Sequence, residues 1–424
     1  MRAALLIAAC LLLSPPCASA QSPAPDEASP GAADTETPEA APEDQARTTD
    51  RRTAWVERVR GWFDNTSAPT VQPVFGVVAP GAGLSAGAAA EVVRLGRTPL
   101  GVGVDGMVSI RSYRQLAVRF GILGSRRQLA ALRPWDTTLG PVLNDGDREA
   151  EGLAVYVEHQ YRHLPGLSLF GVTGGDLART DFGRDTTGTD VVLQWRARRN
   201  LDVGVRAGST MVDAYAGGDG HLVNTDVALP VLAPALDGRT RYTTLGAGAG
   251  WDGRDHPTRP TRGGVAQLAW WAFRPTDPSA TAFTRTTVDL RAYRQVGSAR
   301  HVLAARLLAS IDQHGSGTTV PFHMMQTLGG SETLRGFHSY RLRGERLASV
   351  SVESRWQINR LFDVVPFVDL GAVGRGPVDQ RASGLLTSFG AGLRTHLGER
   401  AVLRTDIAAS REGARFILTL DAPF

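Results

Sequence analysis

One glycine-rich segment holds the side chain with the clearest chemical role in this sequence. Residues 326–345 read QTLGGSETLRGFHSYRLRGE, with Arg335 at the centre. A guanidinium that is removed from water needs a carboxylate, and its fork shape suits paired hydrogen bonds. Positive φ at four glycines would fold the segment back on itself and fix Arg335 and Phe337 in place; these are Gly329, Gly330, Gly336 and Gly344. We therefore predict a loop that Arg335 locks to acidic side chains, with Phe337 packed against the wall.

Signatures of enzymatic chemistry are weak. The nine histidines are scattered, and none has a metal-ligand spacing such as His-Glu-x-x-His. The sequence contains no Gly-x-Ser-x-Gly elbow and no glycine-rich phosphate loop. Asp252, Arg254 and Asp255 could bind a cation, but a turn network with Arg259 and Arg262 is the favoured interpretation. We predict that the protein is not an enzyme and has neither a metal nor a cofactor.

Composition favours a membrane barrel. No stretch beyond the leader approaches the roughly 18 consecutive apolar residues that a membrane helix needs. The 48 glycines and the 7% aromatic content suit short strands in which apolar and polar residues alternate. The formal net charge is only +4, and no basic tract argues for nucleic acid. The fold class predicted is all-β, a transmembrane antiparallel barrel.

Alternation along the chain predicts about 16 strands, an even number as bacterial barrels require. In 346–358, Val350, Val352 and Trp356 share one face, and Ser351 and Glu353 share the other. These are a lipid face and a lumen face. The predicted strands are 71–79, 83–95, 99–111, 112–124, 150–162, 187–198, 200–213, 239–251, 262–275, 281–296, 299–313, 346–358, 362–375, 383–397, 400–410 and 414–424. Residues 125–149 fit this scheme poorly, as an unusually long turn or an extra hairpin.

The same alternation suggests the partners of Arg335. Glu353 lies on the lumen face of its strand, and Asp369 lies on the lumen face of the next. The loop at 314–345 would join the eleventh and twelfth strands, so Arg335 could reach both carboxylates from within the barrel. At the C-terminus, Phe424 ends an amphipathic strand, as in outer-membrane barrels that are recognised for insertion by such a residue.

The pattern Gly-Gly-Ser-Glu-Thr-Leu-Arg-Gly-Phe at 329–337 closely resembles the Arg-Gly-Phe/Tyr motif in the sixth extracellular loop of the BamA/TamA superfamily of outer-membrane barrels. The likeness continues through 251–263, 367–371, 388–394 and the last strand. The resemblance implies that Glu353 and Asp369 are the partners of Arg335. It also implies a weakly paired seam between the first and last strands. Pro73 and Gly76 in the first strand are compatible with such a seam, and equally with a frayed start.

The first 70 residues lie outside this resemblance. Residues 1–20 have the layout of a secretory signal, and both cysteines fall within them. Residues 21–50 are rich in Pro, Ala and acidic residues and are predicted to be a disordered linker. Residues 51–66 are predicted to form a short amphipathic helix, either solvated or lying at the membrane or the barrel mouth. No segment before Val71 is long enough for the periplasmic POTRA repeats of the family.

The leading functional prediction is a barrel of the outer membrane of a Gram-negative cell that aids insertion or translocation of proteins, and possibly of lipids. Its partners would be outer-membrane lipid, unfolded outer-membrane protein clients and a separate periplasmic protein. The alternative is a passive outer-membrane pore or a structural surface barrel. An outer-membrane hydrolase is a third class, and it would need a Ser-His pair at the barrel wall.

Overall fold

The computed structural model describes residues 70–420 apart from 93, 124–151, 174–175, 199, 218–221, 230–231, 233–235, 237, 257–258, 375, 377–383 and 398–399. Several sequence-based predictions lie outside the described residues. They are the signal at 1–20, the linker at 21–50, the helix at 51–66, the segment 125–149 and the terminal Phe424.

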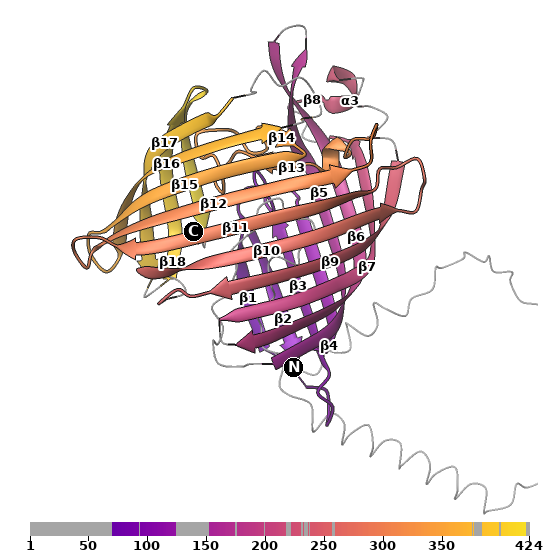
Figure 1. Cartoon of the computed structure of the whole chain (residues 1–424), viewed down its shortest axis with the longest axis horizontal. Helices are drawn as coiled ribbons and strands as arrows, with labels where there is room; N and C mark the ends of the chain where they lie inside the picture. The colour runs from indigo at the N-terminus through magenta and orange to yellow at the C-terminus, as the bar shows by residue number, and fades with distance from the viewer. Residues whose placement is uncertain are drawn as a thin grey trace, which may run out of the picture. The chain divides into compact units, whose positions relative to one another are not determined.

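Within the described residues, sixteen antiparallel strands form the wall of a nearly closed barrel (Figure 1). The predicted fold class is therefore confirmed. The wall strands are β1 (Thr70–Gly76), β2 (Ser85–Val92), β3 (Gly101–Ser109), β4 (Arg114–Ile122), β5 (Gly152–Thr173), β6 (Asp176–Arg198), β7 (Leu201–Ala216), β9 (Gly238–Asp252), β10 (Arg262–Pro275), β11 (Phe283–Gln295), β12 (His301–His314), β15 (Arg346–Gln357), β16 (Phe362–Gly374), β17 (Leu386–Leu397), β18 (Arg400–Ser410) and β19 (Gly413–Leu420).

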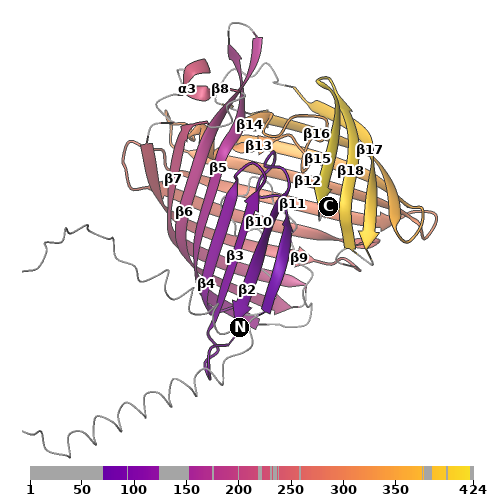
Figure 2. The ribbon, with the colours of Figure 1, turned by 180° about the vertical axis from the view of Figure 1, so that it is seen from behind.

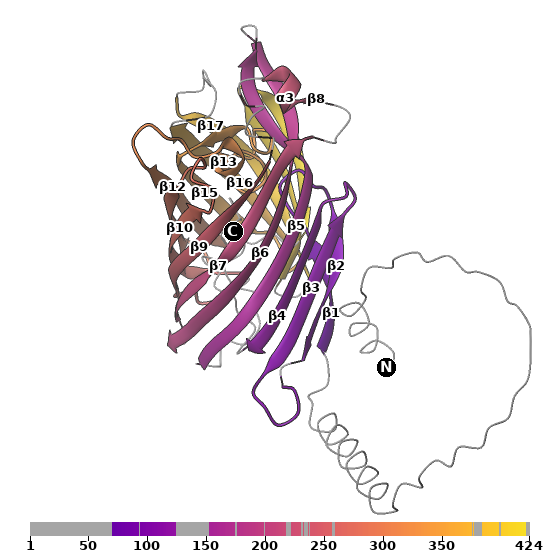
Figure 3. The same ribbon diagram turned by 90° about the vertical axis from the view of Figure 1, so that its right-hand side faces the viewer.

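Residues alternate between the two faces of the wall, as the period of a β-strand requires. On β15, Val350 and Val352 face outward and are 36% and 45% exposed, whereas Ser351 and Glu353 face inward and are buried. The strands run obliquely around the wall (Figure 3). Buried charged side chains and a loop share the interior with apolar clusters, so the core of this barrel is mixed.

The hairpin of β5 and β6 is longer than predicted. Strands were expected over 150–162 and 187–198, whereas β5 continues to Thr173 and β6 begins at Asp176. Pro165 and Gly166 fall at a register shift within this hairpin, and its sequence does not alternate cleanly, which is why it resembles a loop. The hairpin projects beyond the rest of the wall (Figure 1), next to β8 (Val223–Asn224) and the short helix α3 (Thr225–Ala228).

The connection from β12 to β15 lies inside the barrel. It contains the 3₁₀ turn η3 (Phe322–Met324) and a small two-stranded sheet of β13 (Gln326–Leu328) and β14 (Leu342–Gly344). Every residue of these three elements is buried. We call residues 315–345 the lumen loop. The rim of the barrel from which this loop enters the lumen is called the loop end. Among the described residues, no helix is both long and apolar enough to cross a membrane.

The first and last strands meet without a ladder. β1 pairs with β2, and β19 pairs with β18, while the described residues of β1 and β19 share no backbone pairing although the strands are neighbours. The first and last strands lie on the same side of the barrel in Figure 2. We call this junction the seam. Among the described residues, the facing edges of β1 and β19 carry no ladder between them.

Candidate functional site

The lumen loop folds sharply at its glycines, but not all of them act as predicted. Gly329 and Gly330 adopt φ of 118° and 91°. The prediction of positive φ is wrong for Gly336 and Gly344. At Gly336 the requirement is a close approach, because a Cβ there would lie 2.7 Å from the Cβ of Ser388.

Arg335 is fixed by two carboxylates on the barrel wall. Its Nε and Nη2 donate to the two oxygens of Asp369 at 2.8 and 2.6 Å, and its backbone N–H donates to the same carboxylate at 3.1 Å. Its Nη1 donates to Glu353 at 2.7 Å. All three residues are at most 2% exposed. The structure therefore brings together Arg335 and the two partners named from the sequence.

Burial acts to lower the pKa of Arg335, but the hydrogen bond to Asp369 and the charge of Glu353 outweigh it, so its pKa is raised. The guanidinium also lies over the ring of Phe367, with 3.4 Å between Cζ and the ring centroid. This position adds a cation–π contact to the ion pairs. The loop therefore carries a permanent charge into the lumen.

The ion-pair network is larger than the sequence suggested. Asp406 on β18 accepts from Arg394 at 2.6 Å and from Arg404 at 2.6 Å. Arg394 also donates to Glu353 at 3.1 Å, and Arg355 donates to the other oxygen of Glu353 at 2.9 Å. Strand alternation alone places these charged side chains on lumen faces, but it cannot tell which of the many lumen charges meet. The network links β15, β16, β17 and β18 through the loop.

Apolar packing supports the same anchor. Phe337 and Leu334 are fully buried and belong to one cluster with side chains from β12, β15 and β17. Phe337 thus packs the loop against the wall, which is the role its sequence context suggested. Gly371 on β16 lies under this cluster, since a Cβ there would come within 3.1 Å of Leu328 and Leu334.

A second anchor holds the turn η3 at the start of the loop. Three arginines each donate to one of its consecutive carbonyls. Arg343 donates to Phe322 O at 2.9 Å, Arg184 to His323 O at 2.6 Å and Arg285 to Met324 O at 2.6 Å. Phe322 O also accepts from the backbone N–H of Met325 at 3.2 Å, so the three cations extend the hydrogen bonding of the carbonyls in this turn. No sequence motif identified this arrangement.

Two of these cations differ in how their charge is balanced. Arg285 also donates to both oxygens of Asp312, each at 2.7 Å. Within the described residues, Arg343 has no carboxylate partner, and it lies over the ring of Phe182 at 5.2 Å. Burial and the neighbouring charge of Arg184 lower the pKa of Arg343 to about 9. Burial and the same two arginines lower the pKa of His323 to about 3, so His323 is neutral at pH 7.

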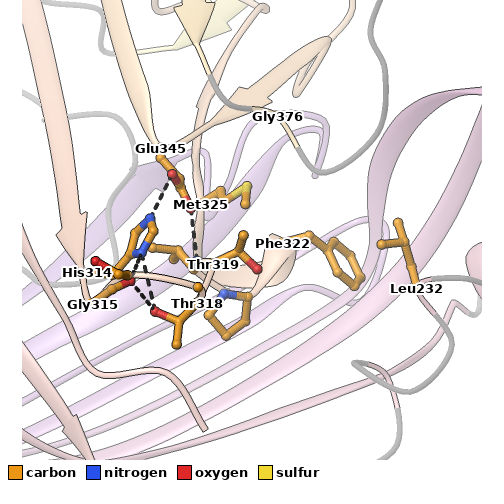
Figure 4. Close-up of a pocket in the computed structure, with 13 residues that line it drawn as sticks. Leu232, His314, Gly315, Thr318, Thr319, Phe322, Met325, Glu345 and Gly376 are labelled. Carbon is orange, nitrogen blue, oxygen red and sulfur yellow. Dashed lines mark hydrogen bonds and ion pairs between the residues drawn. The ribbon is translucent and has the colours of Figure 1, made fainter.

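A cavity of about 750 Å³ lies beside this turn at the loop end. Figure 4 shows Glu345 and His314 in contact with each other on its wall, with Phe322 and Met325 among the apolar lining residues. Glu345 accepts from the backbone N–H of Val320 at 3.0 Å, and its other oxygen lies 3.0 Å from Nε2 of His314. These contacts tie the beginning of the loop to its end.

The tip of the lumen loop, formed by Tyr340 and Arg341, contacts turns on both sides of the seam. Tyr340, which has an unusual φ of 62°, packs in a cluster with Val78 and Ala82 in the turn between β1 and β2. The next residue, Arg341, forms an ion pair with Glu412 in the turn between β18 and β19. The loop therefore joins the two ends of the sheet that have no ladder between them.

The acidic turn after β9 is held internally. Arg254 pairs with Asp252, with 2.9 Å between Nε and Oδ1, while Asp255 accepts from the backbone N–H groups of Thr261 and Arg262 at 2.9 and 3.1 Å. The side chain of Arg259 instead reaches Asp363. Within the described part of the chain, no group of three or more His, Cys, Asp or Glu side chains could hold a metal ion.

A barrel of sixteen antiparallel strands with an arginine-anchored loop in its lumen defines the class of protein. The model of the Omp85 superfamily domain matches residues 147–415, and the chain belongs to this superfamily. The resemblance to the BamA/TamA superfamily is thereby confirmed. A search of curated proteins gives no significant match.

Solved structures with the same fold include BamA from Haemophilus ducreyi lacking POTRA domains 1–3, at 14% identity and a TM-score of 0.59. That comparison covers 83% of this chain and 69% of the other. CdiB from Acinetobacter baumannii has 11% identity and a TM-score of 0.45, with 84% and 66% covered. CdiB from Escherichia coli has 16% identity and a TM-score of 0.46, with 84% and 60% covered. At 14% identity, the likeness to BamA concerns the fold.

Proposed function

We propose that this Omp85 superfamily barrel resides in the outer membrane and aids the insertion or translocation of proteins there. The partners are outer-membrane lipid and unfolded outer-membrane protein clients, and no cofactor takes part. The mechanism is non-covalent, because a client strand pairs with a free edge of the barrel at the seam.

The observation that carries this proposal is the contrast between the seam and the loop anchor. β1 and β19 present strand edges without a mutual ladder, and such edges are templates for a further strand. Beside the seam, the Arg335 network ties β15 to β18 together, up to the strand that pairs with β19. A barrel with one wall tied together and one open junction can admit a client strand without losing its fold.

The loop tip adds control over that junction. Tyr340 and Arg341 hold the turns on either side of the seam at the loop end, so opening there requires the loop to shift. The ion pair of Arg341 with Glu412 is partly exposed and is therefore weak compared with the buried pairs of Arg335. Opening by loss of the tip contact would leave the Arg335 anchor in place.

The test compares ion conductance of the refolded full chain in planar bilayers with that of Arg335→Ala. We expect small, fluctuating conductance for the wild type, because the loop fills the lumen, and a larger conductance once the anchor is lost. In parallel, insertion of an unfolded outer-membrane protein into vesicles that contain the barrel is measured by protection from protease. Faster insertion than in protein-free vesicles is the expected result.

A passive pore is the alternative. It predicts a large, steady conductance that Arg335→Ala does not change, together with client insertion no faster than in protein-free vesicles. The charged lumen is compatible with a pore, but the buried lumen loop opposes free passage. Those two results together would replace the insertion proposal.

We also propose that the barrel has no catalytic activity. A Ser-His pair does occur at the wall, where Ser354 Oγ lies 2.8 Å from Nε2 of His301. Ser354 also accepts from Nε1 of Trp356 at 2.9 Å, and the His301 ring stacks on Trp356. Within the described residues no carboxylate orients the other ring nitrogen, which a catalytic triad needs. The pair instead positions Trp356 at the barrel surface.

A fluorogenic phospholipid distinguishes these roles. We expect no hydrolysis above background from either the wild type or Ser354→Ala. Turnover by the wild type that disappears in Ser354→Ala would establish a hydrolase and contradict the proposal.

A further inference from the structure

The outer surface of β4 to β9 carries an in-register row of ionisable residues. One residue from each of five neighbouring strands lies directly opposite the next across four ladders. In order these are Arg114, His163, Asp185, Asp213 and Arg239. Each points outward, by the alternation of burial along its strand. We call these residues the charged row.

On β5 to β9, the next two parallel rows toward the middle of the barrel remain largely polar, and the third is apolar. Two residues further along each strand toward the middle of the barrel, the row on β5 to β9 contains Tyr161, Thr187, Met211 and Arg241. The next row contains His159, Thr189, Ser209, Thr243 and Arg274. The row after that is apolar, with Val157, Val191, Ala207, Leu245 and Ala272. On β5 to β9, polar side chains thus give way to hydrocarbon toward the middle of the wall.

This gradient marks where lipid hydrocarbon ends on this side. On β9 the outward residues run from Arg241 through Leu245 to Trp251, and Leu245 and Trp251 are 48% and 42% exposed. The eleven residues from Arg241 to Trp251 match the roughly 9–11 residues of a tilted strand that spans a bilayer core. Trp and Tyr concentrate at both membrane interfaces, so if Trp251 marks one interface, the length of the strand puts Arg241 at the other, level with the lipid head groups.

The balance of charge at this level is positive. These rows contain four arginines and two aspartates; they are Arg114, Arg239, Arg241, Arg274, Asp185 and Asp213. Both aspartates are already engaged. Asp185 accepts from the hydroxyl of Tyr215 at 2.9 Å and lies 2.7 Å from Nδ1 of His163, and Asp213 accepts from Arg239 at 2.8 Å.

Arg241 and Arg274 remain without an ion-pair partner in the described part of the chain, and both are exposed. Arg274 lies opposite Thr243, two residues along the same face from Arg241, so the two cations are diagonal neighbours. Residues at diagonal positions on adjacent strands lie about 7–8 Å apart. Two long guanidinium side chains at that separation can reach the same phosphate group.

We propose that Arg241 and Arg274, with Arg239 beside them, bind the phosphate group of lipids in the leaflet at the loop end. The hydroxyls of Thr189, Ser209 and Thr243 offer hydrogen bonds to the glycerol or sugar part of the same head groups, and the apolar row contacts the acyl chains. Phosphorylated lipid fits because its charged, polar head group and its hydrocarbon follow the order of the rows. The inference rests on the proposed membrane location and not on client insertion.

The experiment measures binding of fluorescent phosphatidic acid to the detergent-solubilised full chain. Diacylglycerol with the same acyl chains is the neutral counterpart, and inorganic phosphate is the soluble competitor. The variant is R241Q/R274Q. The matched control is R294Q/R300Q, which removes two exposed arginines at the opposite end of the barrel. R241K/R274K keeps the charge and tests rescue.

We expect the wild type to prefer phosphatidic acid to diacylglycerol and R241Q/R274Q to lose roughly 25-fold in affinity, since each arginine near an anionic surface contributes about fivefold. R294Q/R300Q and R241K/R274K should retain most of it. Unchanged affinity in R241Q/R274Q, or an equal loss in R294Q/R300Q, would overturn the site. Displacement by inorganic phosphate at comparable concentration would show a soluble-anion site instead. Client insertion is scored separately, so failure of either proposal can be recognised.

Discussion

The Arg335 anchor makes a strong prediction about stability. Arg335→Met keeps the bulk of the side chain but removes three side-chain hydrogen bonds, two to Asp369 and one to Glu353. Glu353 keeps Arg355 and Arg394 as partners. Asp369, which has no exposed surface, keeps only neutral donors. Leaving a buried charge uncompensated costs about 3–5 kcal/mol, so we expect the free energy of unfolding to fall by about that amount.

The assay is urea unfolding in detergent micelles, followed by the fluorescence of the eight tryptophans. The double variant Arg335→Met with Asp369→Asn removes the stranded charge, and we expect it to be more stable than Arg335→Met alone by at least about 1 kcal/mol. Arg239→Met is the control, because its side chain is 69% exposed and such pairs contribute about 0–1 kcal/mol. A loss at Arg335 no larger than at Arg239, or no recovery in the double variant, would refute the anchor.

Three further variants test the remaining features of the loop in the same assay. Gly336→Ala should destabilise by about 1–3 kcal/mol through overpacking, whereas Gly384→Ala, where a Cβ meets nothing within 4 Å, should change little; equal effects would contradict the close approach. Arg343→Met should cost at least about 2 kcal/mol less than Arg335→Met, because no carboxylate is stranded; equal costs would be the opposing result. His323 has its pKa lowered to about 3, so between pH 6.5 and 3 the unfolded chain binds the proton first and stability falls by about 1.4 kcal/mol per pH unit. This part of the acid dependence should be absent in His323→Gln, and identical pH profiles would count against a neutral buried histidine.

Much of this site was accessible from local sequence. The two-residue period of a strand placed Glu353 and Asp369 on lumen faces, and the loop glycines marked where the chain turns. The count of sixteen strands followed from the same alternation. These features depend on neighbours a few residues apart, and for that reason the sequence alone reveals them.

Where the local pattern was ambiguous, the prediction was incomplete. The hairpin of β5 and β6 lacks clean alternation and contains Pro165 and Gly166, so residues 163–186 resembled a connection. Gly336 was predicted to need positive φ, but its requirement comes from Ser388 and Ala409 on other strands. A glycine looks the same in sequence whether the backbone or a distant neighbour requires it.

The sequence by itself determined the barrel, the identity of its lumen faces and the arginine that anchors the loop, because strand period and glycine content are local properties. Only the tertiary structure decided which charges meet. The three arginines on η3 come from β6, β11 and β14, and the charged row arises from the registers of four successive ladders. Register accumulates across strands that lie far apart in the chain, so no local pattern encodes it.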